Sequence, residues 1–333
     1  MSEPSDPAPH PLVFVELLAG PDRRLGALRW HVRPATAAPA LDWLRSPALA
    51  ELAAALPCAW PRVAVAGWPA EHQAAVRDLG HPLLDAHDTP AGGTPWPAQA
   101  RWCQGDWYLA PPAKPNVAQA ASRQRALQLL QMVTDDADTH ALEDVFRHDA
   151  ALSYQLLRLV NSVAVGSRRE ITSFGQAILM LGRQQLKRWL NLLLFAARDD
   201  DERSAMLMAH VSLRARGMEL LAQATGLDRS AQDQAFMTGM FSMLGVLFGT
   251  PLVEMLRTIR VPDALHAALV DRQGELGPLL TAWEAVERHD ADATAHALAP
   301  WGVGPDAFNT LLLQACGWML HLTDNAPGHG PAA

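Results

Sequence analysis

A proline-dense stretch, Ala110-Pro-Pro-Ala-Lys-Pro-Asn116, divides the chain into two parts of different character. Prolines this close together cannot continue a helix or a central strand, so the stretch predicts a linker. The 333 residues are enough for two domains, and 49% of them are apolar, which allows sizeable buried cores. We therefore expect one domain over residues 11–115 and a second over residues 116–325.

The first part carries signals of both strands and helices. Leu12–Leu18 is a short apolar run. The segment Arg62–Trp68, helical spacing over Pro69–Leu79 and then His81-Pro-Leu-Leu-Asp85 are together typical of one β-α-β step. Thr89–Pro97, rich in proline and glycine, predicts a loop. A small α/β domain is expected here.

The second part is a succession of amphipathic helices. Apolar residues recur at helical spacing over residues 121–132 and 152–162. Later helices are expected over residues 183–197, 205–225, 230–247, 252–260, 262–272, 276–288 and 305–321. Because the connections are short, a compact helical bundle follows, and the fold class of the whole chain is α+β.

Several classes of protein are disfavoured. The first eleven residues lack the basic and apolar regions of a signal peptide, and the later apolar runs are too short or too interrupted to cross a bilayer. The three cysteines show no Cys-x-x-Cys spacing, which argues against a disulfide framework. We expect a cytoplasmic protein without a cofactor, and the net charge of -8 makes nucleic acid an unfavoured partner.

Basic residues nevertheless gather in the second part. Arg168, Arg169, Arg183, Lys187 and Arg188 are candidates for binding a phosphate ligand or an acidic partner. Residues 183 and 187 are four apart, so they share one helical face. Plain solvated charge is the simpler reading of this basic cluster.

The motifs in residues 149–182 resemble those of the HDOD domain. They read Asp149-Ala-Ala-Leu-Ser-Tyr-Gln-Leu-Leu-Arg-Leu-Val-Asn-Ser162, Arg168-Arg-Glu-Ile-Thr-Ser173 and Gln176-Ala-Ile-Leu-Met-Leu-Gly182. The resemblance is closest to the family that joins a degenerate EAL domain to an HDOD domain. It implies an all-α, HD-like bundle and a role in cyclic-di-GMP-linked signal transduction.

The first part resembles the end of an EAL domain. The resemblance rests on Val63–Leu84 and on Cys103-Gln-Gly-Asp-Trp-Tyr-Leu-Ala-Pro-Pro112. A complete barrel of this type needs about 200–250 residues, so the resemblance implies a truncated remnant. Aligning Gly26–Trp30 with the EAL signature puts Leu28 where the catalytic glutamate belongs, and Glu16 is the rival. Hydrolysis of cyclic di-GMP by this region is not expected.

The metal site of HD phosphohydrolases is also altered. Gly239-Met-Phe-Ser-Met-Leu-Gly245 resembles the family's segment around its His-Asp pair and puts Ser242 and Met243 at those two positions. The resemblance places His210 at the first histidine position. A hydroxyl and a thioether do not replace an imidazole and a carboxylate as ligands, so we expect neither a metal nor a catalytic residue.

Three His-Asp dipeptides elsewhere are expected to be structural. They are His87-Asp88, His148-Asp149 and His289-Asp290. The sequence therefore predicts a non-catalytic signalling or scaffold protein that acts through protein-protein contacts, with signalling proteins as partners, self-association and no membrane. Two alternatives stay open: a metal-dependent HD-type phosphohydrolase, and nucleotide or nucleic-acid binding through residues 168–188.

Overall fold

The computed structural model describes most of the chain outside its middle. The described ranges are residues 11–93, 95–111, 201–258 and 261–323, with isolated positions at 127, 128, 131, 132, 135, 141, 142, 182, 186, 188, 190 and 192. The helices expected over residues 121–132, 152–162 and 183–197 lie largely outside the described residues, and the three quoted HDOD motifs lie there almost entirely.

The first part of the chain forms a four-stranded sheet in the order β1-β2-β3-β4. Strands β1 (Leu12–Ala19) and β2 (Leu25–Arg33) pair antiparallel, whereas β3 (Cys58–Pro61) and β4 (Leu83–Leu84) extend the sheet in parallel. The apolar run at the start of the chain, which the sequence left as strand or helix, is the strand β1. Seven of the eight residues of β1 are buried, so this strand is central to the packing.

Helices accompany these strands. They are α1 (Leu41–Leu44), α2 (Pro47–Ala55), α3 (Arg62–Ala66), α4 (Ala70–Asp78) and the 3₁₀ turns η1 (Ala86–Asp88) and η2 (Trp107–Leu109). The expected β-α-β step exists, since α4 separates the parallel strands β3 and β4.

The first strand of that step was placed too late in the sequence. Arg62–Ala66 is helical, and the strand is the preceding Cys58–Pro61. Burial explains the difference: Trp60 is 0% exposed, whereas Val63 is 85% exposed. The valines suggested a strand by their propensity, but the chain buries the tryptophan instead.

The second part is helical throughout its described residues. Its elements are α9 (Ser204–Ala224), α10 (Arg229–Phe241), α11 (Leu244–Phe248), α12 (Leu252–Thr258), α13 (Asp263–Asp271), α14 (Leu276–Glu287), α15 (Ala291–Leu298), η3 (Ala299–Trp301) and α16 (Pro305–Thr323). Helix α9 packs against α10, α14 and α16 and is buried on almost every side. It is the central helix of the described bundle.

Two details of the bundle were predicted wrongly. The single helix expected over residues 230–247 is divided into α10 and α11, and Ser242 ends α10 by donating its hydroxyl to the carbonyl of Gly239 at 2.7 Å. Helix α15 was missed, because its residues read as a polar stretch. Asp290 begins it as an N-cap, accepting a hydrogen bond from the amide of Ala293.

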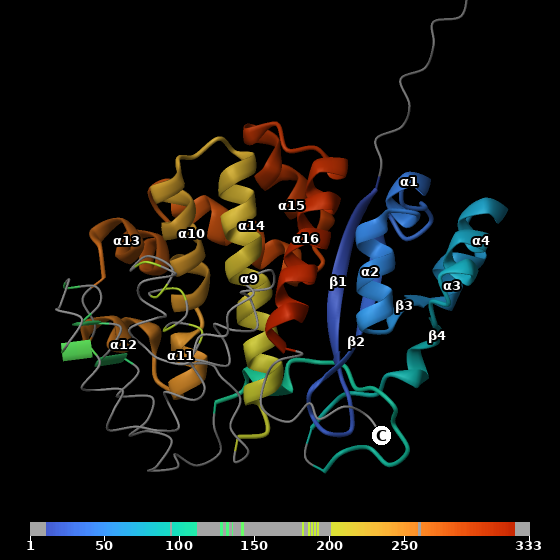
Figure 1. The fold of residues 1–333 in the computed structure, drawn as a ribbon, viewed down its shortest axis with the longest axis horizontal. Helices are drawn as coiled ribbons and strands as arrows, with labels where there is room; N and C mark the ends of the chain where they lie inside the picture. The colour runs from blue at the N-terminus through green and yellow to red at the C-terminus, as the bar shows by residue number, and fades with distance from the viewer. Residues whose placement is uncertain are drawn as a thin grey trace, which may run out of the picture.

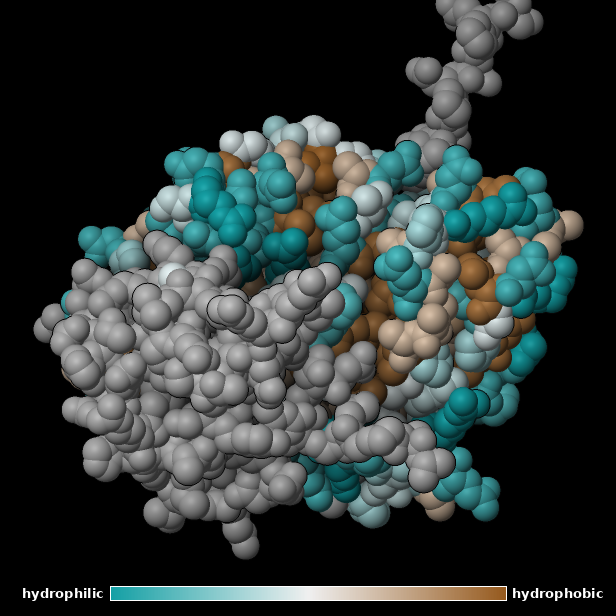
Figure 2. Space-filling view, in the orientation of Figure 1, coloured by the Kyte–Doolittle hydropathy of each residue, from teal (hydrophilic) through white to brown (hydrophobic). Residues whose placement is uncertain are grey.

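The sheet and the bundle pack directly against each other. Figure 1 shows β1 and α2 beside α16, in agreement with the packing of both elements on that helix. On the face seen in Figure 2, hydrophilic residues cover the outer helices and apolar residues come to the surface in the seam between bundle and sheet. Among the described residues, no helix combines the length and apolarity needed to span a bilayer.

Candidate active site between the sheet and the helical bundle

A polar cluster centred on His210 lies where η2, α9, α10 and α14 meet. His210 and Arg214 are one turn apart on α9, Glu287 ends α14, Ser242 ends α10 and Tyr108 comes from η2. Residues four apart on a helix share one face, so the fold of α9 brings the imidazole and the guanidinium together. The cluster therefore combines residues from both parts of the chain.

Glu287 connects the groups of this cluster. The Nε of Arg214 donates to Oε1 of Glu287 at 2.8 Å, and Nη2 donates to Oε2 at 2.5 Å. The Nε2 of His210 lies 3.3 Å from Oε1 of Glu287, and its Nδ1 lies 3.3 Å from the hydroxyl of Tyr108. The Nε2 of His210 also lies 3.4 Å from Nη2 of Arg214, which can only donate, whereas the carboxylate can only accept. The imidazole thus lies between a guanidinium and a carboxylate on its Nε2 side and the Tyr108 hydroxyl on its Nδ1 side.

The electrostatics of the cluster favour charged Glu287 and neutral Tyr108. Burial alone raises the pKa of Glu287, but Arg214 and His210 outweigh it and bring that pKa to about 2. Burial, together with Asp106, Glu287 and Glu16, raises the pKa of the Tyr108 hydroxyl above its usual value. The side chain of Glu287 keeps 19% of its surface exposed and that of His210 keeps 11%, so solvent reaches the cluster from one side.

The described residues of this cluster do not fit a metal centre. Nη1 of Arg214 donates to Oγ of Ser242 at 2.7 Å, and Met243 is buried among apolar residues. A guanidinium bound to both Glu287 and Ser242 puts a fixed positive charge where a cation would have to bind. One imidazole and one already paired carboxylate do not provide the ligand set of a transition metal.

A second polar cluster lies on the sheet. Oε2 of Glu16 accepts from Nε of Arg29 at 2.9 Å and lies 3.0 Å from Nε2 of His31. Arg29 also donates to Oγ1 of Thr89 at 2.5 Å and to the side chain of Gln104. Leu28, which the sequence resemblance aligned with the EAL glutamate, is fully buried. Glu16 is thus paired with Arg29 and in contact with His31 rather than presented to a ligand.

The two described His-Asp dipeptides have structural contacts. Asp85 and Asp88 cap η1 reciprocally, and Asp85 also accepts from Nε of Arg62 at 3.0 Å. With His87 they are the one group of three metal-type ligands close together in the described part of the chain. In the third dipeptide, Asp290 caps α15, and His289 donates from Nε2 to the carbonyl of Val15 at 3.3 Å. His148-Asp149 lies outside the described residues.

Of the basic cluster, the structure describes Arg188 alone. Its guanidinium is buried, donates to both carboxylate oxygens of Glu219, and lies 3.4 Å from Asp233. It also lies 4.0 Å from the centroid of the Phe236 ring. Arg188 is thus engaged inside the bundle. Arg168, Arg169, Arg183 and Lys187 lie outside the described residues, so ligand binding by the cluster stays a prediction.

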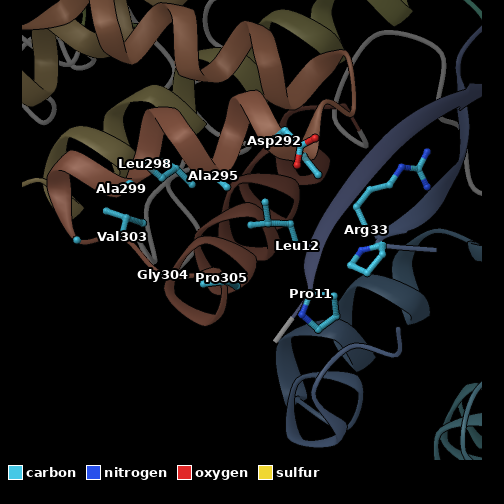
Figure 3. A pocket seen from close by; sticks show the side chains of 13 residues that line it. Pro11, Leu12, Arg33, Asp292, Ala295, Leu298, Ala299, Val303, Gly304 and Pro305 are labelled. Carbon is cyan, nitrogen blue, oxygen red and sulfur yellow. The ribbon is translucent and has the colours of Figure 1, made fainter. Parts of the chain in front are cut away.

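A cavity of about 890 Å³ lies at the other end of the seam, where β1 begins and α15 and α16 meet. Figure 3 shows Leu12, Leu298 and Val303 lining it, with Arg33 and Asp292 near one end. It is separate from the His210 cluster and offers mainly apolar contacts.

Sequence reasoning identified His210 and Ser242 but missed Tyr108, Arg214 and Glu287. The four-residue spacing of His210 and Arg214 on a predicted helix was a signal that could have paired them. Tyr108 and Glu287 are 102 and 77 positions away from His210 in the sequence, and no local pattern connects such distant residues.

The fold and this cluster define a helical-bundle domain packed on a small sheet, with a buried polar centre around His210. Residues 120–305 match the model of the HDOD domain, which is more than half of the chain. The chain therefore belongs to the HDOD domain family, as the sequence motifs predicted.

Two curated relatives extend the comparison. The chain is 30% identical over 195 residues to the cyclic di-GMP phosphodiesterase CdgJ of Vibrio cholerae, covering 58% of this chain and 44% of that protein. It is 26% identical over 166 residues to the uncharacterized protein YuxH of Bacillus subtilis, covering 49% of this chain and 40% of that one. The matched segments thus span less than half of either relative.

A candidate phosphohydrolase of Shewanella amazonensis with a solved crystal structure gives a TM-score of 0.42 at 15% identity, over 63% of this chain and 98% of that one. This likeness is too low to support an argument. The predicted non-catalytic scaffold is nevertheless contradicted, because CdgJ is named as a phosphodiesterase.

Proposed function

We propose that the chain is a phosphodiester hydrolase in cyclic-di-GMP-linked regulation. The observation that carries the proposal is the 195-residue similarity to the cyclic di-GMP phosphodiesterase CdgJ. It is supported by the His210 cluster, which offers acid-base chemistry. The sequence left two alternatives open, and this proposal corresponds to the HD-type phosphohydrolase. It differs from that alternative because protein groups take the place of the metal.

The proposed chemistry is proton transfer at His210. Such a site usually combines a nucleophile or proton donor, a base, and a third group that orients the base. Here Tyr108 is the proton donor, His210 is the base and Glu287 orients His210. The oxygen of a water molecule bonds to phosphorus and the bond from phosphorus to the sugar oxygen breaks. His210 takes the water proton through the Tyr108 hydroxyl and then returns it to the leaving oxygen.

Arg214 acts as a positioning residue in this proposal. Its two hydrogen bonds to Glu287 hold the carboxylate ionised and oriented toward His210. A preorganised charge of this kind stabilises the imidazolium that forms during proton transfer.

We also propose that the sheet region is a shortened remnant of an EAL-type barrel, occupying residues 11–115. Its support is the alternation of strands and helices through the parallel strands β2, β3 and β4, as in α/β barrels. In this proposal the remnant no longer performs its own chemistry, because Arg29 is paired with Glu16 and His31 occupies the same carboxylate oxygen. It supplies Tyr108 to the neighbouring bundle instead.

The proposal is tested with the purified full chain and cyclic di-GMP, following the appearance of linear products by chromatography. We expect hydrolysis that persists in a chelator. Substituting His210→Asn should lower the rate by roughly 10²-fold or more, which is typical of losing a general base. The matched control is His266→Asn, an exposed histidine of α13, which should leave the rate unchanged.

Two results would contradict this assignment. Absence of any linear product, with the chain folded, would remove the enzymatic function. Activity that vanishes in a chelator and returns with manganese would instead favour a metal-dependent site.

A further inference from the structure

Two histidines face each other across the seam between the sheet and the bundle. His31 lies on β2, and His289 follows the last residues of α14. Their ring centroids are 4.7 Å apart, with 34° between the ring planes. His289 also donates to the carbonyl of Val15 on β1 at 3.3 Å, so it links the bundle to the sheet.

The backbone of His289 is fixed in an unusual conformation. Its φ of 54° lies in the left-handed region, which few residues other than glycine adopt. The contacts to β1 and β2 and the hydrogen bond from the amide of His289 to the carbonyl of Val286 hold it there. Such conformations persist only where the surroundings enforce them.

The charges around this pair come from both sides of the seam. From the sheet, Glu16 on β1 and Arg29, His31 and Arg33 on β2 act on it. The single acid of this group is shared, because Glu16 already contacts Arg29 and His31. On the bundle side, the carboxylate of Asp290 accepts from the amide of Ala293. If His289 becomes protonated, none of these carboxylates is therefore free to pair with its positive charge.

We propose that His31 and His289 form a pH-sensitive joint, which holds the sheet against the bundle when His289 is neutral and loosens when His289 becomes protonated. The joint is a regulatory device that does not require the chain to be an enzyme. A protonated His289 faces the imidazole of His31 and the guanidinium of Arg33. Separation of the two elements relieves this repulsion and gives the charge access to water.

The pH range follows from the shift of the His289 pKa. Burial, His31 and Arg33 lower it below the ordinary 6.5, and the contacts to Val15 and Glu16 only partly oppose this. In the open state the ring takes up a proton near the ordinary pKa, whereas in the closed state it does so only at a lower pH. The closed joint is therefore fully stable above a pH of about 6.5 and loses stability as the pH falls below it.

Opening of the joint would change the geometry of the His210 cluster through the end of α14. Glu287 and His289 are two residues apart at the same helix end, so a movement of His289 shifts the carboxylate that orients His210. This consequence rests on the proposed function, whereas the joint itself does not.

The test compares amide protection factors of the full chain at about pH 7.5 and about pH 5.5 by hydrogen exchange and NMR, with intrinsic exchange rates divided out. The reporters are the amide of Val13, bonded to Asn309, and that of Asp290, bonded to the carbonyl of Ala285. We expect both protection factors to fall about threefold or more at the lower pH, while amides inside α9 change little.

Substitution of His289 should remove this response. In His289→Gln the amide can still donate to Val15 but cannot titrate, so we expect protection that is independent of pH. In His31→Gln we expect a smaller response that persists, because burial and Arg33 still lower the pKa of His289. His296→Gln, at an exposed position of α15, is the control and should behave like the unmodified chain. Equal protection of the unmodified chain at both pH values, or an undiminished fall in His289→Gln, would overturn the joint. Hydrolysis of cyclic di-GMP is measured separately, so its absence leaves this test intact.

Discussion

The side chain of Asn309 pairs with the backbone around Val13 as a neighbouring strand would. Its Oδ1 accepts from the amide of Val13 at 2.9 Å, and its Nδ2 donates to the carbonyl of Pro11 at 3.0 Å. The carbonyl of Asn309 itself accepts from the indole nitrogen of Trp43 at 3.1 Å. One residue of α16 thus covers the outer edge of β1, where unpaired backbone groups would otherwise be buried.

Substituting Asn309→Leu should therefore be costly. The side-chain volume is nearly kept, but the amide of Val13 and the carbonyl of Pro11 lose their partners in a buried place. We expect a loss of about 2–4 kcal/mol in the free energy of unfolding, measured in urea. The change Gln314→Leu, at an exposed position of the same helix, should cost far less. Similar losses in both variants would show that the pairing is unimportant.

Gly217 on α9 packs directly against the ring of Trp283 on α14. A Cβ atom on Gly217 would lie 1.8 Å from Cη2 of that ring. We expect Gly217→Ala to destabilise the chain by about 3 kcal/mol, as is typical of severe overpacking. Combining it with Trp283→Leu should cost less than the sum of the two separate changes, as measured by thermal unfolding. Strict additivity would argue against the steric explanation.

Arg188 and Glu219 form a buried ion pair that also involves Arg216. Substituting Glu219→Gln leaves both guanidinium groups without their carboxylate, and we expect a loss of about 3–5 kcal/mol in urea unfolding. The control Glu254→Gln, exposed on α12, should be nearly neutral. Replacing both Arg188 and Glu219 by methionine should cost less than the sum of the two single replacements. A pair that contributes nothing would give additive losses.

Because of Glu287, the free energy of unfolding of the chain should fall at acid pH. Its pKa of about 2 lies below the ordinary 4.5, so the stabilisation is complete above pH 4.5 and is lost as the pH falls toward 2. We expect Glu287→Gln to lower the free energy of unfolding by about 3–5 kcal/mol at neutral pH, since Arg214 then lacks its partner, and by progressively less toward pH 2. Thermal unfolding across this range measures the difference, with the exposed Glu275→Gln as control. A difference that does not change with pH would contradict the ion pair.

Much of the fold could be predicted from periodicity. Helix α9 and the helices from α12 to α14 fall within a few residues of their predicted bounds, because their apolar residues recur regularly along the helix. The division between α10 and α11 and the strand at Cys58–Pro61 were not predictable in this way. The first depends on a hydroxyl that ends the helix, and the second on a tryptophan that the whole fold buries.

The site was harder to predict than the fold. Motif comparison found His210 and Ser242 because it tests positions along one sequence. It could not find Glu287, which reaches them only when α14 packs beside α9, or Tyr108, which precedes the linker. It also led to the prediction of a protein without catalysis, because it compared only the metal-ligand positions and did not consider the groups that contact His210.

The connection that begins at Ala110 is anchored at its start. Arg203, just ahead of α9, donates to the carbonyl of Ala110 immediately after η2, and Arg23 in the turn before β2 is paired with Glu202. These attachments keep Tyr108 beside His210. A chimera that joins the N-terminal part of a relative to this bundle would therefore replace the residue that contacts His210 at the position of Tyr108. The two parts of the chain should therefore be exchanged together.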